Sequence, residues 1–386
     1  MGTADGTVTG STKVVDHGAD ADRYVFAVMG DGFTAAEQPA FQTACTGFTT
    51  ALQATRPFDA VWNQINVHRI DIESHQSGAD NPLACGDGSA PTGGATTADT
   101  YLDARYCGDG SIRRLLTVDS GLAQTTANAR VPGWDVIVVI VNHAEYGGSG
   151  GGKVAVYSVA ADALEVALHE LGHSAYGLAD EYEYYQGCSS GETDHDTYTG
   201  PEPGEPNVTA VSDRSTLKWR HLVASATPVP TTTNPDCTTC DTQANPVGAN
   251  DIGAFAGAKY FHCGLYRPAH DCLMRTVGSS LPFCAVCQEA IKAEITRGSS
   301  PACFVASAVY ADTTHPDVVW LRDWRDRRLR PGARGRTGAR ALVAVYGRVG
   351  PPAARHVQRH PALARLLRDR VLGPAVGLAR RHGRRG

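Results

Sequence analysis

The feature that most constrains this chain is the segment from Asp162 to Gly177, whose pattern predicts a single amphipathic helix. Apolar residues recur there at the spacing of a helix that buries one face: Leu164, Leu168, Leu171 and Ala175. Asp162 is suited to begin the helix as its N-cap. Gly177 is suited to end it, because glycine enters the left-handed conformation without a steric penalty. We therefore expect a helix that packs against a hydrophobic core.

Two histidines lie four residues apart on this helix, in the run His169-Glu170-Leu171-Gly172-His173. Because a helix has about 3.6 residues per turn, both imidazoles point to nearly the same side and can bind one metal ion. Glu170 can act as general base toward an attacking water whose pKa a zinc ion lowers. The pattern predicts one catalytic zinc ion. The alternative is a solvated or core helix that carries these residues by chance.

A third metal ligand is expected just beyond the helix. A hydrolytic zinc site needs three protein ligands and one open position. Asp180 and Glu181 follow Gly177, where the chain can turn back toward the metal. We expect Asp180 to be the ligand, with Glu181 as second choice. Alternatively, both carboxylates only cap the turn.

Strand and helix patterns interleave through the N-terminal half. We expect strands at 23–29, 65–72, 135–142 and 153–159, and helices at 35–54, 101–124 and 283–297, with a glycine-rich turn at 145–152. Strands alternating with helices predict an α/β or α+β domain built on a mixed sheet.

Composition divides the chain into parts. We expect a flexible N-terminus at 1–20, a catalytic domain at 21–300 with a loop-rich insertion at 188–250, and a small helical module at 301–386. From Leu321 onward there are 18 Arg, no Lys and 3 Asp, whereas the preceding residues carry a net charge of −20. Such asymmetry indicates separate modules.

The run from His169 to Tyr182 resembles the signature of the IgA-peptidase family of metzincin-like zinc metallopeptidases. Three further segments are similar to stretches of that family: 65–72, 141–150 and 266–275. The resemblance covers roughly residues 12–300. It implies a metzincin-like catalytic domain with a mixed twisted sheet and an active-site helix.

The resemblance also implies an activity and a site. It implies a zinc-dependent endopeptidase acting on protein or peptide substrates. Glu170 would be the base, and the zinc would lie on His169, His173 and Asp180. Met274 would form an apolar floor under the metal. The generic metzincin pattern puts the third ligand one residue earlier, where this chain has an alanine. The alternative is a non-catalytic zinc-containing binding module, which the retained His and Glu residues disfavour.

The resemblance suggests where the substrate binds. In metzincin-like enzymes an edge strand before the active-site helix pairs with extended substrate, so residues 147–156 are expected to line the cleft. A plain hairpin is the alternative. Four tyrosines are candidates for a hydrogen bond to the oxyanion: Tyr182, Tyr184, Tyr185 and Tyr266.

Eleven cysteines favour disulfides and an oxidising compartment. A secreted or cell-surface location is therefore favoured, although the first 16 residues lack the basic and apolar regions of a signal peptide. Cys85 and Cys107 flank a loop and can pair. Asn207-Val208-Thr209 is an N-glycosylation sequon, which has meaning only after secretion.

Two C-x-x-C pairs are present: Cys237 with Cys240, and Cys284 with Cys287. They predict either a structural zinc ribbon or disulfides. One disulfide considered joins Cys263 or Cys272 to the second pair.

The C-terminal part resembles the CFI-box module in residues 303–310 and 315–318, followed by Arg-rich segments. Its charge would suit docking on an anionic membrane surface or an acidic partner. Solvated helices of a small bundle, or an intramolecular contact with the acidic catalytic part, are the alternatives. Nucleic-acid binding is not expected, because no recognised motif is present.

Overall fold

The computed structural model describes residues 5–298 without 109, 111, 185–187 and 189–195, and beyond them residues 309, 317 and 361–372. The chain divides into two compact units, Met1–Arg297 and Gly298–Gly386. In the second unit the described part includes α9 (Pro361–Leu367) and the π-helical turn η5 (Arg368–Leu372). Most of the predicted CFI-box-like module lies outside the described residues. Among the described helices, none has the length and apolar character needed to span a membrane.

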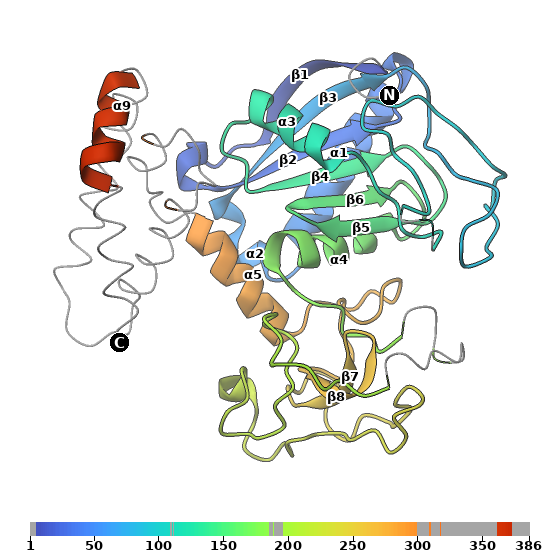
Figure 1. Ribbon diagram of the computed structural model, residues 1–386, viewed down its shortest axis with the longest axis vertical. Helices are drawn as coiled ribbons and strands as arrows, with labels where there is room; N and C mark the ends of the chain where they lie inside the picture. Colours follow the sequence, from blue (N-terminus) through green and yellow to red (C-terminus); the bar gives the residue numbers. More distant parts are fainter. Residues whose placement is uncertain are drawn as a thin grey trace. The chain divides into compact units, whose positions relative to one another are not determined.

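A six-stranded mixed sheet, in the order β1-β3-β2-β4-β6-β5, organises the first unit (Figure 1). Its strands are β1 (Gly6–Val15), β2 (Tyr24–Asp31), β3 (Ile65–Ser74), β4 (Val136–Val141), β5 (Gly148–Gly151) and β6 (Val154–Ser158). The inner strands β3, β2, β4 and β6 pair in parallel, whereas β1 and β5 are antiparallel edge strands. A mixed sheet with several helices confirms the expected α+β class.

Helices cover both faces of this sheet (Figure 1). They are α1 (Gln38–Ala54), α2 (Phe58–Val61), α3 (Ser120–Arg130), α4 (Ala163–Tyr176) and α5 (Ala285–Gly298), with short 3-10 turns η1 (Asp20–Asp22), η2 (Ala35–Glu37), η3 (Trp62–Gln64) and η4 (Arg220–Leu222). One core joins α1, α4 and α5 to Phe26 and Val138, and a second core on the opposite face joins α3 to Val25 and Ile137. Burial on both faces explains why β4 is a continuous apolar run.

The expectation of a flexible N-terminus is wrong for residues 6–15. They form β1, which pairs antiparallel with β3. The strand is rich in Thr, Ser and Gly, and most of its side chains are exposed or half-buried. Backbone pairing with β3 therefore holds β1 in place, and its polar composition conceals the strand.

The expectation of a helix over 101–124 is also wrong for most of that range. Helix α3 begins only at Ser120, where the Asp119 carboxylate accepts a hydrogen bond from the Leu122 N–H. Upstream, the buried Asp31 carboxylate accepts hydrogen bonds from the N–H groups of Leu102 and Ala104. A carboxylate that collects backbone donors in this way favours an irregular loop over a helix.

The pKa of Asp31 is expected to make stability depend on pH. Burial raises the pKa of this carboxyl to about 6, although hydrogen bonds from Leu102 and Thr100 lower it. Because the folded state holds the proton more tightly, Asp31 stabilises the fold below about pH 4, and this contribution is lost as the pH rises to about 6. Asp31→Asn does not titrate at this position. Its free energy of unfolding, measured relative to that of the wild type, should therefore rise by about 3 kcal/mol between about pH 4 and pH 7. Urea unfolding of both proteins measures this difference, and a pH-independent difference would contradict it.

A smaller two-stranded sheet consists of β7 (Phe255–Ala258) and β8 (Phe261–Arg267), which form an antiparallel hairpin. The described part of 188–250 consists of loops and η4. It packs on this hairpin through Trp219, whose Nε1–H donates to the Gly253 carbonyl at 2.6 Å. Disulfides Cys188–Cys240 and Cys237–Cys263 close the insertion on itself and on β8. The insertion thus supports the hairpin rather than standing apart from it.

Candidate metal and catalytic site

Helix α4 carries both histidines and follows the predicted bounds, since it begins after Asp162 and ends at Gly177, which is left-handed. The Nδ1 atom of His169 lies 3.0 Å from the Leu273 carbonyl oxygen, and that of His173 lies 2.8 Å from the Leu178 carbonyl oxygen. Because a carbonyl only accepts, each Nδ1 carries a proton, and Nε2 is the atom of each ring that is left to bind a metal ion. The two Nε2 atoms face each other at 3.1 Å.

Asp180 completes a triangle with these two nitrogens. Its Oδ1 atom lies 3.1 Å from each Nε2, is buried, and has no hydrogen-bond partner. Burial acts to raise the pKa of Asp180, but His169 and His173 lower it far below its usual value, so the carboxyl is ionised. Ligand atoms about 2.0–2.2 Å from a tetrahedral zinc ion are separated by about 3.3–3.6 Å. The donor set and its spacing therefore fit zinc.

Glu181, the second-choice ligand, lies in a different environment from Asp180. Its Oε1 atom accepts a hydrogen bond from Asn207 Nδ2 at 2.9 Å, and its carboxylate lies beside Cys272 and Cys287. Asn207 also bonds both the N–H and the carbonyl of Ala179. This buried amide, read in the sequence only as a glycosylation sequon, therefore fixes both the backbone just before Asp180 and the Glu181 carboxylate.

The tip of the β7–β8 hairpin holds Asp180 from the other side, a contact that sequence reasoning missed. The N–H groups of Lys259 and Tyr260 donate to the carbonyls of Asp180 and Tyr182 at 3.1 and 3.0 Å. The Tyr260 hydroxyl donates to Asp180 Oδ2. Both turn residues have positive φ, 51° and 69°, although such two-residue turns favour Gly or Asn. Backbone strain of this kind is characteristic of functional sites.

Removing the Tyr260 hydroxyl is expected to weaken metal binding. Second-sphere partners orient a ligand and typically change metal affinity by about 10–100-fold. Tyr260→Phe should lose this support for Asp180 Oδ2 while keeping the ring. Zinc competition against a chromogenic chelator measures the effect. Tyr198→Phe, which removes a hydroxyl bonded to the Pro201 carbonyl, is the matched control, and equal affinities for all three proteins would contradict the assignment.

Met274 lies against α4 at Gly172, the residue before His173. A Cβ at Gly172 would lie 2.5 Å from Met274 Sδ, so the helix approaches this side chain through a glycine. The Met274 carbonyl accepts the Glu181 N–H at 2.8 Å, and the preceding carbonyl, of Leu273, accepts from His169. The turn at Met274 therefore fixes both a histidine and the segment that carries Asp180.

The glycine-rich segment expected to be a turn forms the edge strand β5. A Cβ at Gly150 would lie 2.4 Å from the Glu170 carbonyl oxygen, and one at Gly148 would lie 2.6 Å from Val166 Cγ1. Only glycine permits the strand to pack this closely on α4. The expectation of a turn overlooked this use of glycine. The close packing places β5 directly beside Glu170.

A cavity of about 600 Å³ opens beside His169 and Glu170. Its lining includes Arg114, Tyr146, Tyr182, Tyr184 and Arg275. The Tyr182 ring stacks on the His169 ring with centroids 6.4 Å apart. Burial raises the pKa of Glu170 above its usual value, and the positive charge of the neighbouring histidines opposes this. The cavity therefore combines the Glu170 carboxyl, whose pKa is raised, with side chains that can donate hydrogen bonds.

Tyr266, another oxyanion candidate, is not among the residues that line this cavity. Tyr266 pairs through its backbone with Thr209 and packs against the core around Trp219. Tyr185 lies outside the described residues. Tyr182 and Tyr184 are the two candidates that the cavity includes.

The cysteines correct part of the sequence analysis. Cys85 and Cys107 form a disulfide, as considered. The zinc ribbon built from both C-x-x-C pairs is wrong, because Cys237 and Cys240 are bonded to Cys263 and Cys188. The disulfide to the second pair is also absent from the described residues, where Cys272, Cys284 and Cys287 are free. Cys303 lies outside the described residues.

Comparison with known proteins identifies the family of this chain. The family model of IgA Peptidase M64 matches residues 12–248 and 241–295, and so covers most of the sheet, α4 and the hairpin. A search of curated proteins found no match. The match spans well over half of the chain and includes every residue of the site described above. The chain therefore belongs to the IgA peptidase M64 family.

Proposed function

We propose that this peptidase is a zinc-dependent metalloendopeptidase whose metal is held by His169, His173 and Asp180. The observation that carries the proposal is the triangle of two Nε2 atoms and Asp180 Oδ1, with edges of 3.1 Å. Two imidazole nitrogens and a carboxylate oxygen at this spacing form a ligand set that suits a divalent cation. Membership of a peptidase family implies protein or peptide substrates.

Glu170 is the proposed general base. A zinc ion bound at the triangle would lower the pKa of a water molecule and polarise the scissile carbonyl. Glu170 borders the same cavity, so it can accept the proton of the attacking water and then pass it to the leaving amine. Its raised pKa makes this carboxyl a better proton acceptor than an ordinary glutamate.

Tyr182 is the proposed hydrogen-bond donor to the carbonyl oxygen of the substrate. It borders the cavity, lies beside His169 and interacts with Arg114. A donor held in place by stacking and by a guanidinium can stabilise developing negative charge without reorganisation.

The outer edge of β5 is the proposed site for the substrate backbone. The N–H and carbonyl of Gly148 bond Arg114 and Leu116 on that side at 3.0 and 3.3 Å. Because strand residues alternate, Gly150 directs its own N–H and carbonyl to the same edge. An extended peptide that pairs there would run beside Glu170. The alternative of a non-catalytic binding module leaves this arrangement of base, metal ligands and cavity without a purpose.

Removal and return of metal test the proposal. We expect the full-length protein to cleave casein, to lose at least about 100-fold in activity on treatment with 1,10-phenanthroline, and to recover on addition of zinc. His169→Ala should stay inactive with added zinc. His221→Ala, which changes an exposed histidine bonded to Glu289, is the matched control. Casein cleavage that resists chelation would overturn the proposal.

A further inference from the structure

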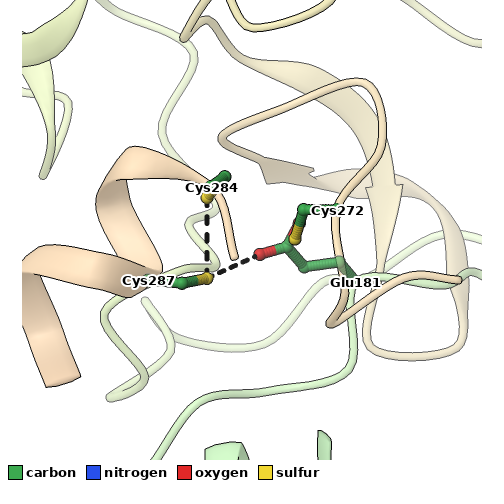
Figure 2. A group of neighbouring side chains, drawn as sticks. All are labelled: Glu181, Cys272, Cys284 and Cys287. Carbon is green, nitrogen blue, oxygen red and sulfur yellow. Dashed lines mark hydrogen bonds between the residues drawn. The ribbon is translucent and has the colours of Figure 1, made fainter. Parts of the chain in front are cut away.

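A second group of potential metal ligands lies outside the proposed catalytic site. It consists of Glu181, Cys272, Cys284 and Cys287, whose ligand atoms all lie within 4.8 Å of one another. Figure 2 shows the four side chains pointing toward a common centre. They come from three parts of the chain: the loop after α4, the loop after β8, and the start of α5. We call this group the cysteine cluster.

We propose that the cysteine cluster binds a second, structural zinc ion through three thiolates and one carboxylate. The Sγ atoms of Cys272 and Cys287 lie 3.1 and 3.3 Å from the Glu181 carboxylate oxygens, and Cys284 Sγ lies 3.5 Å from Cys287 Sγ. Two sulfur atoms each about 2.3 Å from a tetrahedral zinc ion are separated by about 3.8 Å. The four groups therefore need only small shifts to surround one ion.

The local structure of the second C-x-x-C pair places its two thiols side by side at the start of a helix. Cys284 precedes α5 and accepts the Gln288 N–H through its carbonyl at 2.9 Å, so the helix begins there. Positions three apart on a helix lie on the same side, which brings Cys284 and Cys287 together. The unpaired N–H groups of a helix N-terminus also stabilise a thiolate.

Burial supports a cation at this place. Glu181, Cys272 and Cys287 are buried, at 0%, 1% and 0% exposure. The Glu181 carboxyl accepts one hydrogen bond from the Asn207 amide, and its other neighbours are thiols, which are weak hydrogen-bond donors. Zinc would supply the missing positive charge. Three thiolates and a carboxylate exceed the charge of zinc, and the buried Arg267 guanidinium interacts with Glu181 and offsets part of the excess.

A disulfide is the main competing explanation. Three cysteines can form one disulfide, which would leave the third thiol beside a buried carboxyl. The same fold closes three disulfides elsewhere, whereas these three cysteines stay free. The presence of an oxygen ligand at the centre of the group also fits a metal and has no role in a disulfide.

The proposed ion would brace the catalytic half of the molecule. Glu181 follows Asp180 directly, and Cys272 lies two residues before Met274. Zinc in the cysteine cluster would therefore join the third-ligand segment, the turn at Met274 and the start of α5. This second ion goes beyond the proposed catalytic function and stands on separate residues.

Metal content and X-ray absorption of the full chain test the second site. We expect two zinc ions per wild-type chain, and one in each of His169→Ala and the double variant Cys284→Ala/Cys287→Ala. The ion retained by His169→Ala should show a sulfur-rich first shell. Cobalt substituted into the same variant should give a sulfur-to-metal charge-transfer band. Cys45→Ala, which removes another buried free cysteine, should keep both ions.

The His169→Ala protein keeps the test decisive even if the double cysteine variant does not fold. A retained ion with only nitrogen and oxygen neighbours, or no retained ion, would overturn the proposal. So would titration and mass measurement showing a disulfide among Cys272, Cys284 and Cys287. Failure of the catalytic proposal looks different, because the sulfur-bound ion would then be the one found in the wild type.

Discussion

Replacing Glu170 with glutamine is expected to lower kcat by about 10²- to 10⁴-fold while leaving the zinc content unchanged. Glutamine keeps the size of the side chain but cannot accept a proton from the attacking water. Glu170 is not part of the triangle formed by His169, His173 and Asp180, so metal binding should not need its charge. The expected signature is therefore loss of kcat with little change in KM.

The measurement is peptide hydrolysis by wild type and Glu170→Gln, with metal analysis of the same preparations. Glu289→Gln is the matched control, because it removes an exposed carboxylate on α5 that pairs with His221. It should retain full activity and metal. Equal cleavage by wild type and Glu170→Gln would show that another group acts as base, and simultaneous loss of zinc would assign Glu170 a structural part in the metal site.

The helix that carries His169 and His173 could be predicted from sequence because local signals determine it. Apolar periodicity, Asp162 and Gly177 each act within a few residues, and α4 begins and ends where they indicate. Asp162 occupies the N-cap position without a side-chain hydrogen bond to the helix. Buried central strands such as β4 are predictable for the same reason, since a continuous apolar run needs a two-sided core.

The surroundings of the proposed metal ligands could not be predicted, because contacts between distant segments determine them. Asp180 and Glu181 are adjacent carboxylates, and no local rule says which one turns to the histidines. Asn207 and the hairpin tip at Tyr260 decide this, and they lie far along the chain from Asp180. The tertiary fold brings these residues next to Asp180 and Glu181, and no local sequence pattern indicates it.

Glycines and cysteines were ambiguous for a related reason. Glycine signals a turn in isolation, but in β5 it allows a strand to lie against α4. A C-x-x-C pair is compatible with a metal or a disulfide, and its partner decides between them. The first pair meets Cys188 and Cys263, whereas the second meets Cys272 and Glu181.

The two neighbouring carboxylates provide the second large prediction. Asp180→Asn is expected to weaken zinc binding at the histidine site by more than about 100-fold and to abolish hydrolysis at limiting zinc. The amide keeps the shape of the side chain but removes the negative charge that faces the two Nε2 atoms at 3.1 Å. The loss should exceed that of Tyr260→Phe, since the ligand itself is changed.

Glu181→Gln makes the opposite prediction and serves as the matched variant one residue away. Glu181 contacts Cys272 and Cys287 rather than the histidines. We therefore expect Glu181→Gln to weaken the ion held by sulfur while the histidine-bound ion stays, and Asp180→Asn to do the reverse. X-ray absorption distinguishes the two, because loss of the histidine-bound ion raises the average number of sulfur neighbours per zinc. If Glu181→Gln emptied the histidine site and Asp180→Asn did not, the two carboxylates would have to exchange roles, and the geometry of the triangle would not describe the working enzyme.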